Sequence, residues 1–141
     1  MENTAEKTET TSRHRVLYGV PDGFDALKLA ELADKAPART VLHIVLDDLA
    51  MARLEEVISF FHPEVEILKF PAWDCLPYDR VSPNPDIMGE RVRTLSRLVN
   101  SSGDKPRILL TTINAVLQRV PPRGSFENAH ASGLREGSQD Q

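Results

Sequence analysis

Hydrophobic positions follow two alternating periods along this chain of 141 residues. Continuous apolar runs, typical of buried strands, alternate with segments in which apolar residues recur every three or four positions, as on one face of a helix. The predicted strands are residues 15–20, 40–46, 65–70 and 107–113, and the predicted helices are 25–36, 48–61, 86–99 and a short one at 114–119. Strands that are apolar on both faces and alternate with helices imply right-handed crossovers. The sequence therefore predicts an α/β fold with a parallel sheet of about four strands and flanking helices.

The two ends of the chain lack this pattern. Residues 1–13 are polar and rich in Thr and Glu, and residues 123–141 combine Gly, Ser and polar residues without any period. We expect a disordered lead-in at 1–13, one α/β domain at 14–122 and an unstructured tail at 123–141. A domain that ends after its fourth strand and continues into such a tail suggests a chain cut short.

Composition excludes several classes of protein. Hydrophobic residues make up 40% of the chain, which indicates a folded domain, and the net charge of -4 argues against strong DNA binding by this chain alone. Cys75 is the only cysteine, so neither an internal disulfide nor a cysteine-based zinc site can form. The start lacks a signal-peptide core, and no apolar run approaches the ~18 residues of a membrane span. We expect a cytoplasmic protein that does not bind membranes.

The stretch YGVPDGFDALKLAELA has the order of a phosphate-binding loop: strand, glycine-bearing turn, helix. Such a loop needs glycines whose N–H groups approach the phosphates, a lysine that neutralises them and a hydroxyl for magnesium. Gly19 and Gly23 fit the turn, but the second glycine position holds Phe24, the lysine position Asp25 and the hydroxyl position Ala26. At 4 Å, two unit charges interact by about 4 kcal/mol at an effective dielectric near 20, so Asp25 would repel a nucleotide. We interpret the loop as vestigial and expect no cofactor.

Two other patterns have a structural and a functional interpretation. The strand VLHIVLDD resembles a magnesium-binding strand end, but Asp47 or Asp48 also stands where a helix N-cap belongs, and we favour the cap. The four histidines have no metal-ligand spacing, so we expect no metal site, with His43 as a core or face residue and Cys75 as a packed thiol.

The predicted helix at 86–99 carries an apolar stripe and a group of arginines. The stripe consists of Met88, Val92, Leu95 and Val99, and we expect it to face the core. Arg93 and Arg97 fall opposite the stripe and Arg91 at its shoulder. We favour a solvated face for these arginines over a surface for DNA or a partner.

The stretch FPAWDCLPYDRVSPNPDIMGERVRTL, residues 70–95, is the most unusual part of the sequence. An exposed connection rarely contains Trp73, Leu76, Tyr78 and several prolines, because aromatic residues favour burial and prolines fix the backbone. The stretch could cap the core at the sheet edge or form a rigid surface for a partner, and the two interpretations are compatible.

Four motifs carry a resemblance to a known family: FPAWDCLPYD, SPNPDI, ER-x-x-TL and RILLTTINAVLQRVPP. Together they resemble the N-terminal, UvrB-like region of bacterial transcription-repair coupling factor (the Mfd family) over about residues 15–122. The candidate interaction surface within these motifs is Trp73, Asp74, Tyr78, Asp79, Asp86 and Arg91. The resemblance implies a domain like that of the P-loop NTPases, of the RecA and UvrB domain 1a type. UvrB-type proteins keep an intact phosphate loop at the position where this chain has the vestigial one.

The resemblance also implies what this chain does and does not do. The full-length family is an ATP-dependent DNA translocase that displaces stalled RNA polymerase and recruits UvrA, and its motor domains lie beyond the matched region. We therefore expect a non-catalytic scaffold or interaction domain of a transcription-coupled repair factor. Its partners would be the rest of that factor and, in the full-length context, UvrA or RNA polymerase. The alternative is a stand-alone nucleotide-binding protein with a degenerate P-loop.

Overall fold

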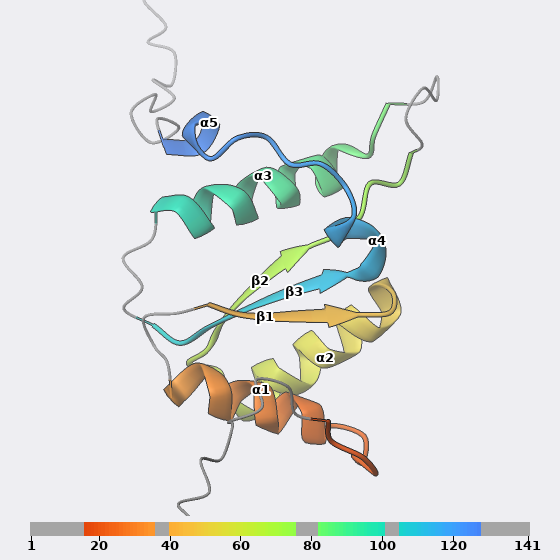
Figure 1. Cartoon of the computed structure of the whole chain (residues 1–141), viewed down its shortest axis with the longest axis vertical. Helices are drawn as coiled ribbons and strands as arrows, with labels where there is room; N and C mark the ends of the chain where they lie inside the picture. Colours follow the sequence, from red (N-terminus) through yellow and green to blue (C-terminus); the bar gives the residue numbers. More distant parts are fainter. Residues whose placement is uncertain (1–15, 36–39, 76–81, 101–104, 128–141) are drawn as a thin grey trace, which may run out of the picture.

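The computed structural model of the chain describes residues 16–35, 40–75, 82–100 and 105–127, which form a parallel sheet with helices on both faces (Figure 1). The elements are α1 (Phe24–Lys35), β1 (Thr40–Val45), α2 (Asp48–Phe61), β2 (Glu66–Phe70), α3 (Pro85–Asn100), β3 (Arg107–Thr112), α4 (Ile113–Val116) and α5 (Gly124–Glu127). The predicted α/β class is confirmed.

The sheet has the strand order β1-β3-β2, and both strand pairs are parallel. The connection from β1 to β2 passes through α2, and the connection from β2 back to the central β3 passes through α3. Because α2 follows β1 on one face of the sheet and α3 follows β2 on the other, the chain leaves the carboxyl ends of β1 and β2 toward opposite faces (Figure 1).

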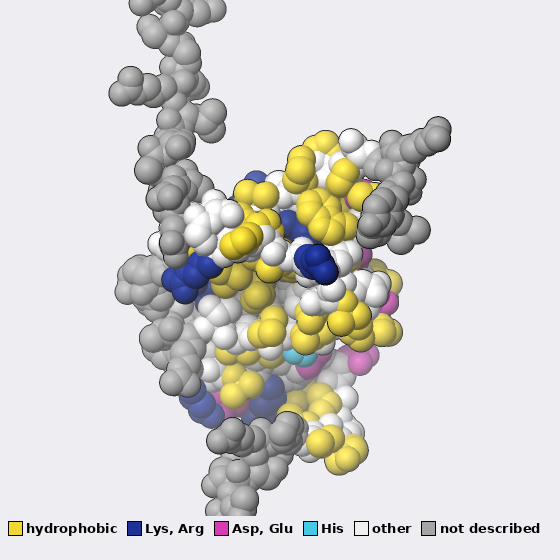
Figure 2. Space-filling model, turned by 45° about the horizontal axis from the view of Figure 1, so that its top comes forward, with side chains coloured by type: hydrophobic (Ala, Val, Ile, Leu, Met, Phe, Trp, Pro, Cys, Tyr) yellow, Lys and Arg dark blue, Asp and Glu magenta, His cyan; other side chains and the backbone are white. Residues whose placement is uncertain are grey.

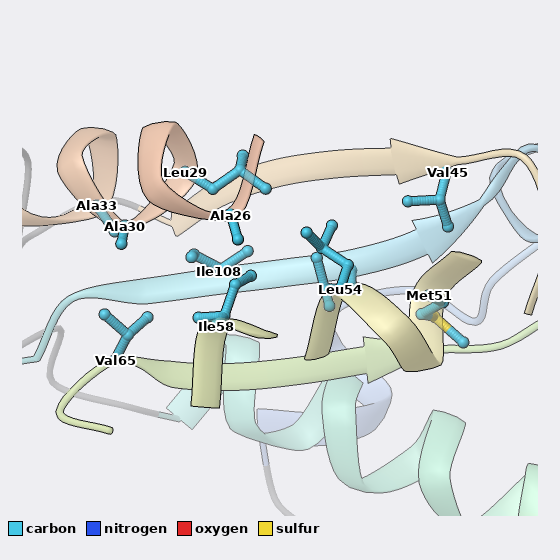
Figure 3. Packing of buried hydrophobic residues seen from close by; sticks show 11 residues of the cluster. Ala26, Leu29, Ala30, Ala33, Val45, Met51, Leu54, Ile58, Val65 and Ile108 are labelled. Atoms are coloured by element: carbon cyan, nitrogen blue, oxygen red, sulfur yellow. The ribbon is translucent and has the colours of Figure 1, made fainter. Parts of the chain in front are cut away.

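The main core lies between the sheet and the two helices α1 and α2 (Figure 3). Small residues on α1 let that helix approach the sheet closely, while α2 contributes larger side chains and β3 two fully buried ones. The cluster consists of Ala26, Leu29, Ala30, Ala33, Val45, Met51, Leu54, Ile58, Val65, Ile108 and Leu110. Asp47 begins α2 as its N-cap, since its carboxylate accepts a hydrogen bond from Ala50 N at 2.8 Å. The predicted cap is confirmed.

The opposite face of the sheet is covered by α3, which lies over β2. Thr94 is buried there, and its hydroxyl donates to the Lys69 carbonyl of β2 at 2.5 Å. Beyond α3 lies α5. Its residue Phe126 is buried, and the Phe126 carbonyl accepts a hydrogen bond from Asn100 Nδ2 at 3.0 Å. The layers on this side are therefore polar at the contact between α3 and β2.

Two predictions about local structure are wrong. Residues 16–20, which the apolar run predicted to be a buried strand, form no strand and are exposed, so the described sheet has three strands rather than about four. No described strand lies beside this segment to pair with it. Residues 124–127, predicted to be unstructured, form α5. The lead-in at 1–13 and the tail beyond 127 lie outside the described residues, so the proposed domain boundaries stay predictions.

Within the described residues, no helix combines the length and the apolar character needed to cross a membrane.

Candidate interaction site

Three segments meet at the carboxyl end of β2 and β3. These are the residues after β2, the residues just before α3, and α4 with the residues that follow it. They surround a cavity of about 920 Å³, which is lined by Ala72, Trp73, Asp74, Cys75, Pro83, Asn114, Leu117, Gln118 and Arg119. Ligands and partners of open α/β sheets commonly bind at the carboxyl ends of the strands. The cavity therefore lies where this kind of fold places its sites.

Arg91 of α3 holds this region together. Only 3% of its surface is exposed, and its guanidinium carbon lies 4.0 Å from the ring centre of Phe70 and 4.5 Å from that of Trp73. Its Nη1 donates hydrogen bonds to the Pro71 carbonyl at 2.5 Å and to Gln118 Oε1 at 3.1 Å. Burial lowers the pKa of Arg91 from its usual value. Arg91 was predicted to lie on a solvated face, and this is wrong because two aromatic rings and two oxygens surround its head.

Gln118 is a residue of the candidate site that the sequence motifs did not single out. Its side-chain oxygen accepts hydrogen bonds from Trp73 N at 2.9 Å and from Arg91. One amide thus joins the segment after α4 to the segment after β2, which lies 45 residues earlier. The only sequence signal was its place in the motif INAVLQR, since a single polar residue in a loop shows no period.

Two of the three acidic residues of the candidate surface, Asp74 and Asp86, lie near the start of α3. The carboxylate of Asp74 accepts from Asn84 N, with distances of 3.2 and 3.3 Å to its two oxygens, and so ties the segment after β2 to the residue that precedes α3. Asn84 Oδ1 in turn accepts from Asp86 N at 2.9 Å. Both carboxylates are exposed.

The structure therefore brings four of the six predicted surface residues to one end of the sheet: Trp73, Asp74, Asp86 and Arg91. Arg91 is buried and contacts the Trp73 ring, whereas Trp73 itself is half-buried and borders the cavity. The other two predicted residues, Tyr78 and Asp79, lie outside the described part of the chain.

The loop that we interpret as a vestigial phosphate loop contains the predicted turn but not the predicted strand. Gly19 and Gly23 have φ values of 64° and 84°, a conformation that L side chains rarely adopt, so both glycines serve the turn. Asp25 Oδ1 accepts a hydrogen bond from Ala26 N at 2.9 Å, and Ala26 is buried in the core. A carboxylate thus lies at the first turn of α1, where a phosphate loop would bind an anion.

The surroundings of this loop are apolar. A cavity of about 510 Å³ there is lined by Pro21, Asp22, Gly23, Phe24, Leu27, Phe61 and His62. No Lys or Arg side chain is among these lining residues. Burial lowers the pKa of His43 on β1. The negative charge of the Asp25 carboxylate opposes that shift.

One group of possible metal ligands occurs in the described residues. Asp34, His62 and Glu64 offer ligand atoms within 4.8 Å of one another, and His62 Nδ1 lies 3.3 Å from Glu64 Oε1. The carboxylates are exposed. The spacing of residues along the sequence does not reveal this group, since Asp34 belongs to α1 whereas His62 and Glu64 follow α2.

Comparison with known proteins gives one recurring name. The chain is 33% identical over 109 residues to the transcription-repair-coupling factor of Haemophilus influenzae. This match covers 77% of the chain and 9% of that protein. It is 32% identical over 123 residues to that of Escherichia coli K12, covering 87% of the chain and 10% of the relative. The factor of Rickettsia bellii is 39% identical over 67 residues, 48% of the chain and 6% of the relative. The predicted resemblance is confirmed.

This chain spans a tenth or less of the length of these three relatives. No protein-family model matches it.

Proposed function

We propose that this chain, which matches a segment of the transcription-repair-coupling factors, acts as a non-catalytic interaction domain in transcription-coupled DNA repair. The observation that carries the proposal is the fixed position of Trp73. Its backbone N–H is bound by Gln118, and its ring lies against the buried guanidinium of Arg91. A rigid, half-buried aromatic residue beside a cavity is typical of the anchor residues of protein interfaces.

Rigidity favours binding because little conformational entropy remains to be lost when a partner docks. Arg91 and Gln118 hold Trp73 from the side of the domain, so its outward side is already in place before association. Asp74 and Asp86 place two exposed carboxylates near the same end of the sheet. The surface suits a partner with an apolar pocket that basic residues border.

The vestigial loop supports the non-catalytic part of the proposal. An acidic first turn opposes the negative charge of a nucleotide, and the described lining of the nearby cavity supplies no Lys or Arg to offset it. The alternative of a nucleotide-binding protein is therefore the weaker one.

The name of the relatives points to the classes of partner. A factor that couples transcription to repair has to contact the transcription machinery, the repair machinery and its own other domains. We propose RNA polymerase, UvrA or the remainder of the repair factor as the partners of the surface around Trp73.

Biolayer interferometry tests the proposal. The chain is immobilised and exposed to purified UvrA and to purified RNA polymerase core enzyme of the same bacterium. We expect micromolar binding of at least one of them, weakened roughly tenfold or more by Trp73→Ala. Phe60→Ala is the matched control, because Phe60 is a strongly exposed aromatic residue on α2, away from this site. Failure of both proteins to bind would exclude UvrA and RNA polymerase as partners, and equal binding by a folded Trp73→Ala variant would contradict the proposed surface.

Calorimetry with ATP and magnesium tests the non-catalytic part separately. We expect no binding heat for the natural chain. Asp25→Lys is the informative variant. Position 26 is left unchanged because Ala26 is buried, so a hydroxyl introduced there would have to enter the core. Micromolar ATP binding by the natural chain would favour the nucleotide-binding alternative.

A further inference from the structure

Three potential metal ligands converge where α1 ends and β2 begins. They are the carboxylate of Asp34, the imidazole of His62 and the carboxylate of Glu64, and their ligand atoms all lie within 4.8 Å of one another. In Figure 1 the carboxyl end of α1 lies beside the start of β2, whereas the cavity at Trp73 lies at the other end of that strand. The group is therefore separate from the candidate interaction site.

The combination of ligand types sets this group apart from ordinary surface charges. Lys, Arg, Asp and Glu side chains are scattered around the hydrophobic middle of the face that Figure 2 shows, and such scattering is no sign of a site. Here one imidazole and two carboxylates come together from two separate segments of the chain. Divalent transition metals accept imidazole nitrogen, whereas Mg²⁺ and Ca²⁺ prefer oxygen ligands alone. The set therefore favours a transition metal.

The distances suit a small divalent ion. With bonds of about 2.0–2.1 Å, neighbouring ligand atoms of a tetrahedral zinc ion lie about 3.4 Å apart. His62 Nδ1 lies 3.3 Å from Glu64 Oε1. The Asp34 side chain is exposed, so a change of rotamer can bring its carboxylate to a similar separation. Three protein ligands leave a further position for water.

The backbone holds the ligand-bearing segments in place. His62 is the C-cap of α2, and its N–H donates to the Ile58 carbonyl at 2.7 Å. The Val65 N–H donates to the His62 carbonyl at 3.1 Å, which closes the turn that also carries Glu64. Val65 and Ala33, which adjoin the ligands in the sequence, are both buried, and Figure 3 shows them at the same end of the core. Both segments are thus anchored in one core, as a pre-organised site requires.

The local charge favours a cation. The carboxyl end of a helix carries a partial negative charge, and the last turn of α2 contains no basic residue that could offset it. Asp34 lies in the last turn of α1, where a carboxylate opposes the helix dipole. The two lysines of α1, Lys28 and Lys35, are paired with Glu31 at 2.7 and 2.6 Å. A cation bound between the two helix ends would offset the negative charge of both.

His62 is partly shielded from water. Its side chain is 23% exposed and lines the cavity of about 510 Å³, together with apolar residues that include Phe24, Leu27 and Phe61. Apolar surroundings lower the local dielectric constant and so strengthen the attraction between an ion and its ligands.

We propose that Asp34, His62 and Glu64 bind one divalent transition-metal ion, for which Zn²⁺ is the probe that fits the ligand set. The ion connects the carboxyl end of α1 to the turn between α2 and β2. Because folding brings the three ligands together, the ion binds the folded chain better than the unfolded one and stabilises the layer formed by α1 and α2.

Calorimetric titration of the metal-free chain with zinc chloride tests the site. We expect one Zn²⁺ per chain, and His62→Gln should weaken binding roughly tenfold or more because it removes the nitrogen ligand. Asp34→Asn should weaken it as well. Glu56→Gln is the matched control, because Glu56 is an exposed carboxylate on α2 outside the group. Magnesium chloride should give no saturable binding.

Thermal unfolding gives a second measurement. Zinc at about ten times its Kd should raise the Tm of the natural chain by roughly 4 °C or more. The rise should be clearly smaller for His62→Gln, and circular dichroism establishes that each variant is folded.

Three outcomes would overturn the proposal. These are no saturable zinc binding by the natural chain, zinc binding that His62→Gln and Asp34→Asn both leave unchanged, and equal affinity for Mg²⁺ and Zn²⁺. The second would assign the ion to other groups of the chain, such as Cys75, and the third would contradict an imidazole ligand. Trp73→Ala should leave zinc binding unchanged, so this test is independent of the proposed repair function.

Discussion

The two edges of the sheet differ in how they meet solvent. At the β2 edge, Glu66 is paired with Arg97 at 2.9 Å and with Arg107 at 2.8 Å, and Lys69 lies 3.0 Å from Glu55 and 3.6 Å from Glu90. These partners come from α2, α3 and β3, so helices on both faces contribute charges to this edge. The β1 edge has no charged residue in its strand, and its outward aliphatic side chains are half-exposed.

The difference shows how one sheet can protect one edge and leave the other available. Burial acts to lower the pKa of Lys69, but the carboxylates of Glu55 and Glu90 outweigh it and raise that pKa. The charge at the β2 edge is therefore stabilised where it discourages association. Within the described residues of β1, no charged side chain opposes pairing with another strand.

The largest loss of stability is expected from substituting Arg91, which connects α3 to the segment after β2. Arg91→Ala removes two hydrogen bonds and two ring contacts and leaves Gln118 and Pro71 with fewer partners. We expect a loss of about 2–4 kcal/mol in the free energy of unfolding, measured by urea denaturation. Arg93→Ala on the exposed face of the same helix should change it by less than about 0.5 kcal/mol. Equal effects of the two substitutions would show that the β2 side is not held by Arg91.

A smaller loss is expected from removing the acid at the β2 edge. Glu66→Ala leaves the nearly buried Arg107 without its carboxylate partner, at a cost of about 1–3 kcal/mol in the free energy of unfolding. Glu31→Ala removes an exposed carboxylate that is paired with two lysines of α1, and because solvent screens these ion pairs it should cost less than Glu66→Ala does. A larger loss from Glu31→Ala than from Glu66→Ala would contradict the closed character of the β2 edge.

Removing the lysine of the β2 edge should change association more than stability. Lys69→Val is expected to alter the free energy of unfolding by no more than about 1 kcal/mol, because the ion pairs are partly exposed. It should, however, promote self-association, since the β2 edge would then lack the charge that discourages pairing. Multi-angle light scattering measures this, with Lys35→Val on α1 as control. An unchanged oligomeric state would show that Lys69 does not protect the edge.

The smallest effect concerns pH and lies on β1. Because burial lowers the pKa of His43, the folded state favours its neutral form, and the nearby Asp25 only partly offsets this. The unfolded chain binds the proton more readily, so stability is complete above about pH 6.5 and falls as the solution becomes more acidic. Urea denaturation across this range should show a shallower decline for His43→Gln than for the natural chain. Parallel declines would assign the pH dependence to other groups.

Much of the fold could be predicted from the sequence because its signals are local. The helix at 48–61 has the predicted bounds, since Asp47 supplies the cap and Pro63 follows shortly after its end. The three strands of the sheet lie within one residue of their predicted ends. Apolar runs that are short, β-branched and bounded by polar turns leave little choice of structure.

The failures concern features that depend on neighbours. An apolar run at 15–20 predicts a strand only if another strand lies beside it, and none is described there. On α3 the apolar period predicted that the stripe with Met88 and Val92 is buried, but Arg91 and Thr94 face the sheet instead. Polar residues can replace an apolar contact when the neighbours supply carbonyl oxygens and aromatic rings, and that supply is not visible along the sequence.

The candidate site was predicted in part. Trp73 and Asp74 stand out by residue type in a proline-rich stretch, whereas Gln118 acts only through contacts with residues far away in the sequence. Sequence motifs located the region, and the structure supplied the reason for its rigidity.

Segment-resolved amide hydrogen exchange tests the central claim, the difference between the two edges, most directly. The exchange rates of the β1 and β2 amides are compared in the natural chain at one dilute protein concentration. We expect the amides of β1 to exchange faster than those of β2, because side chains from the neighbouring helices cover the β2 edge. Equal rates, or slower exchange in β1, would contradict the account of one closed and one open edge.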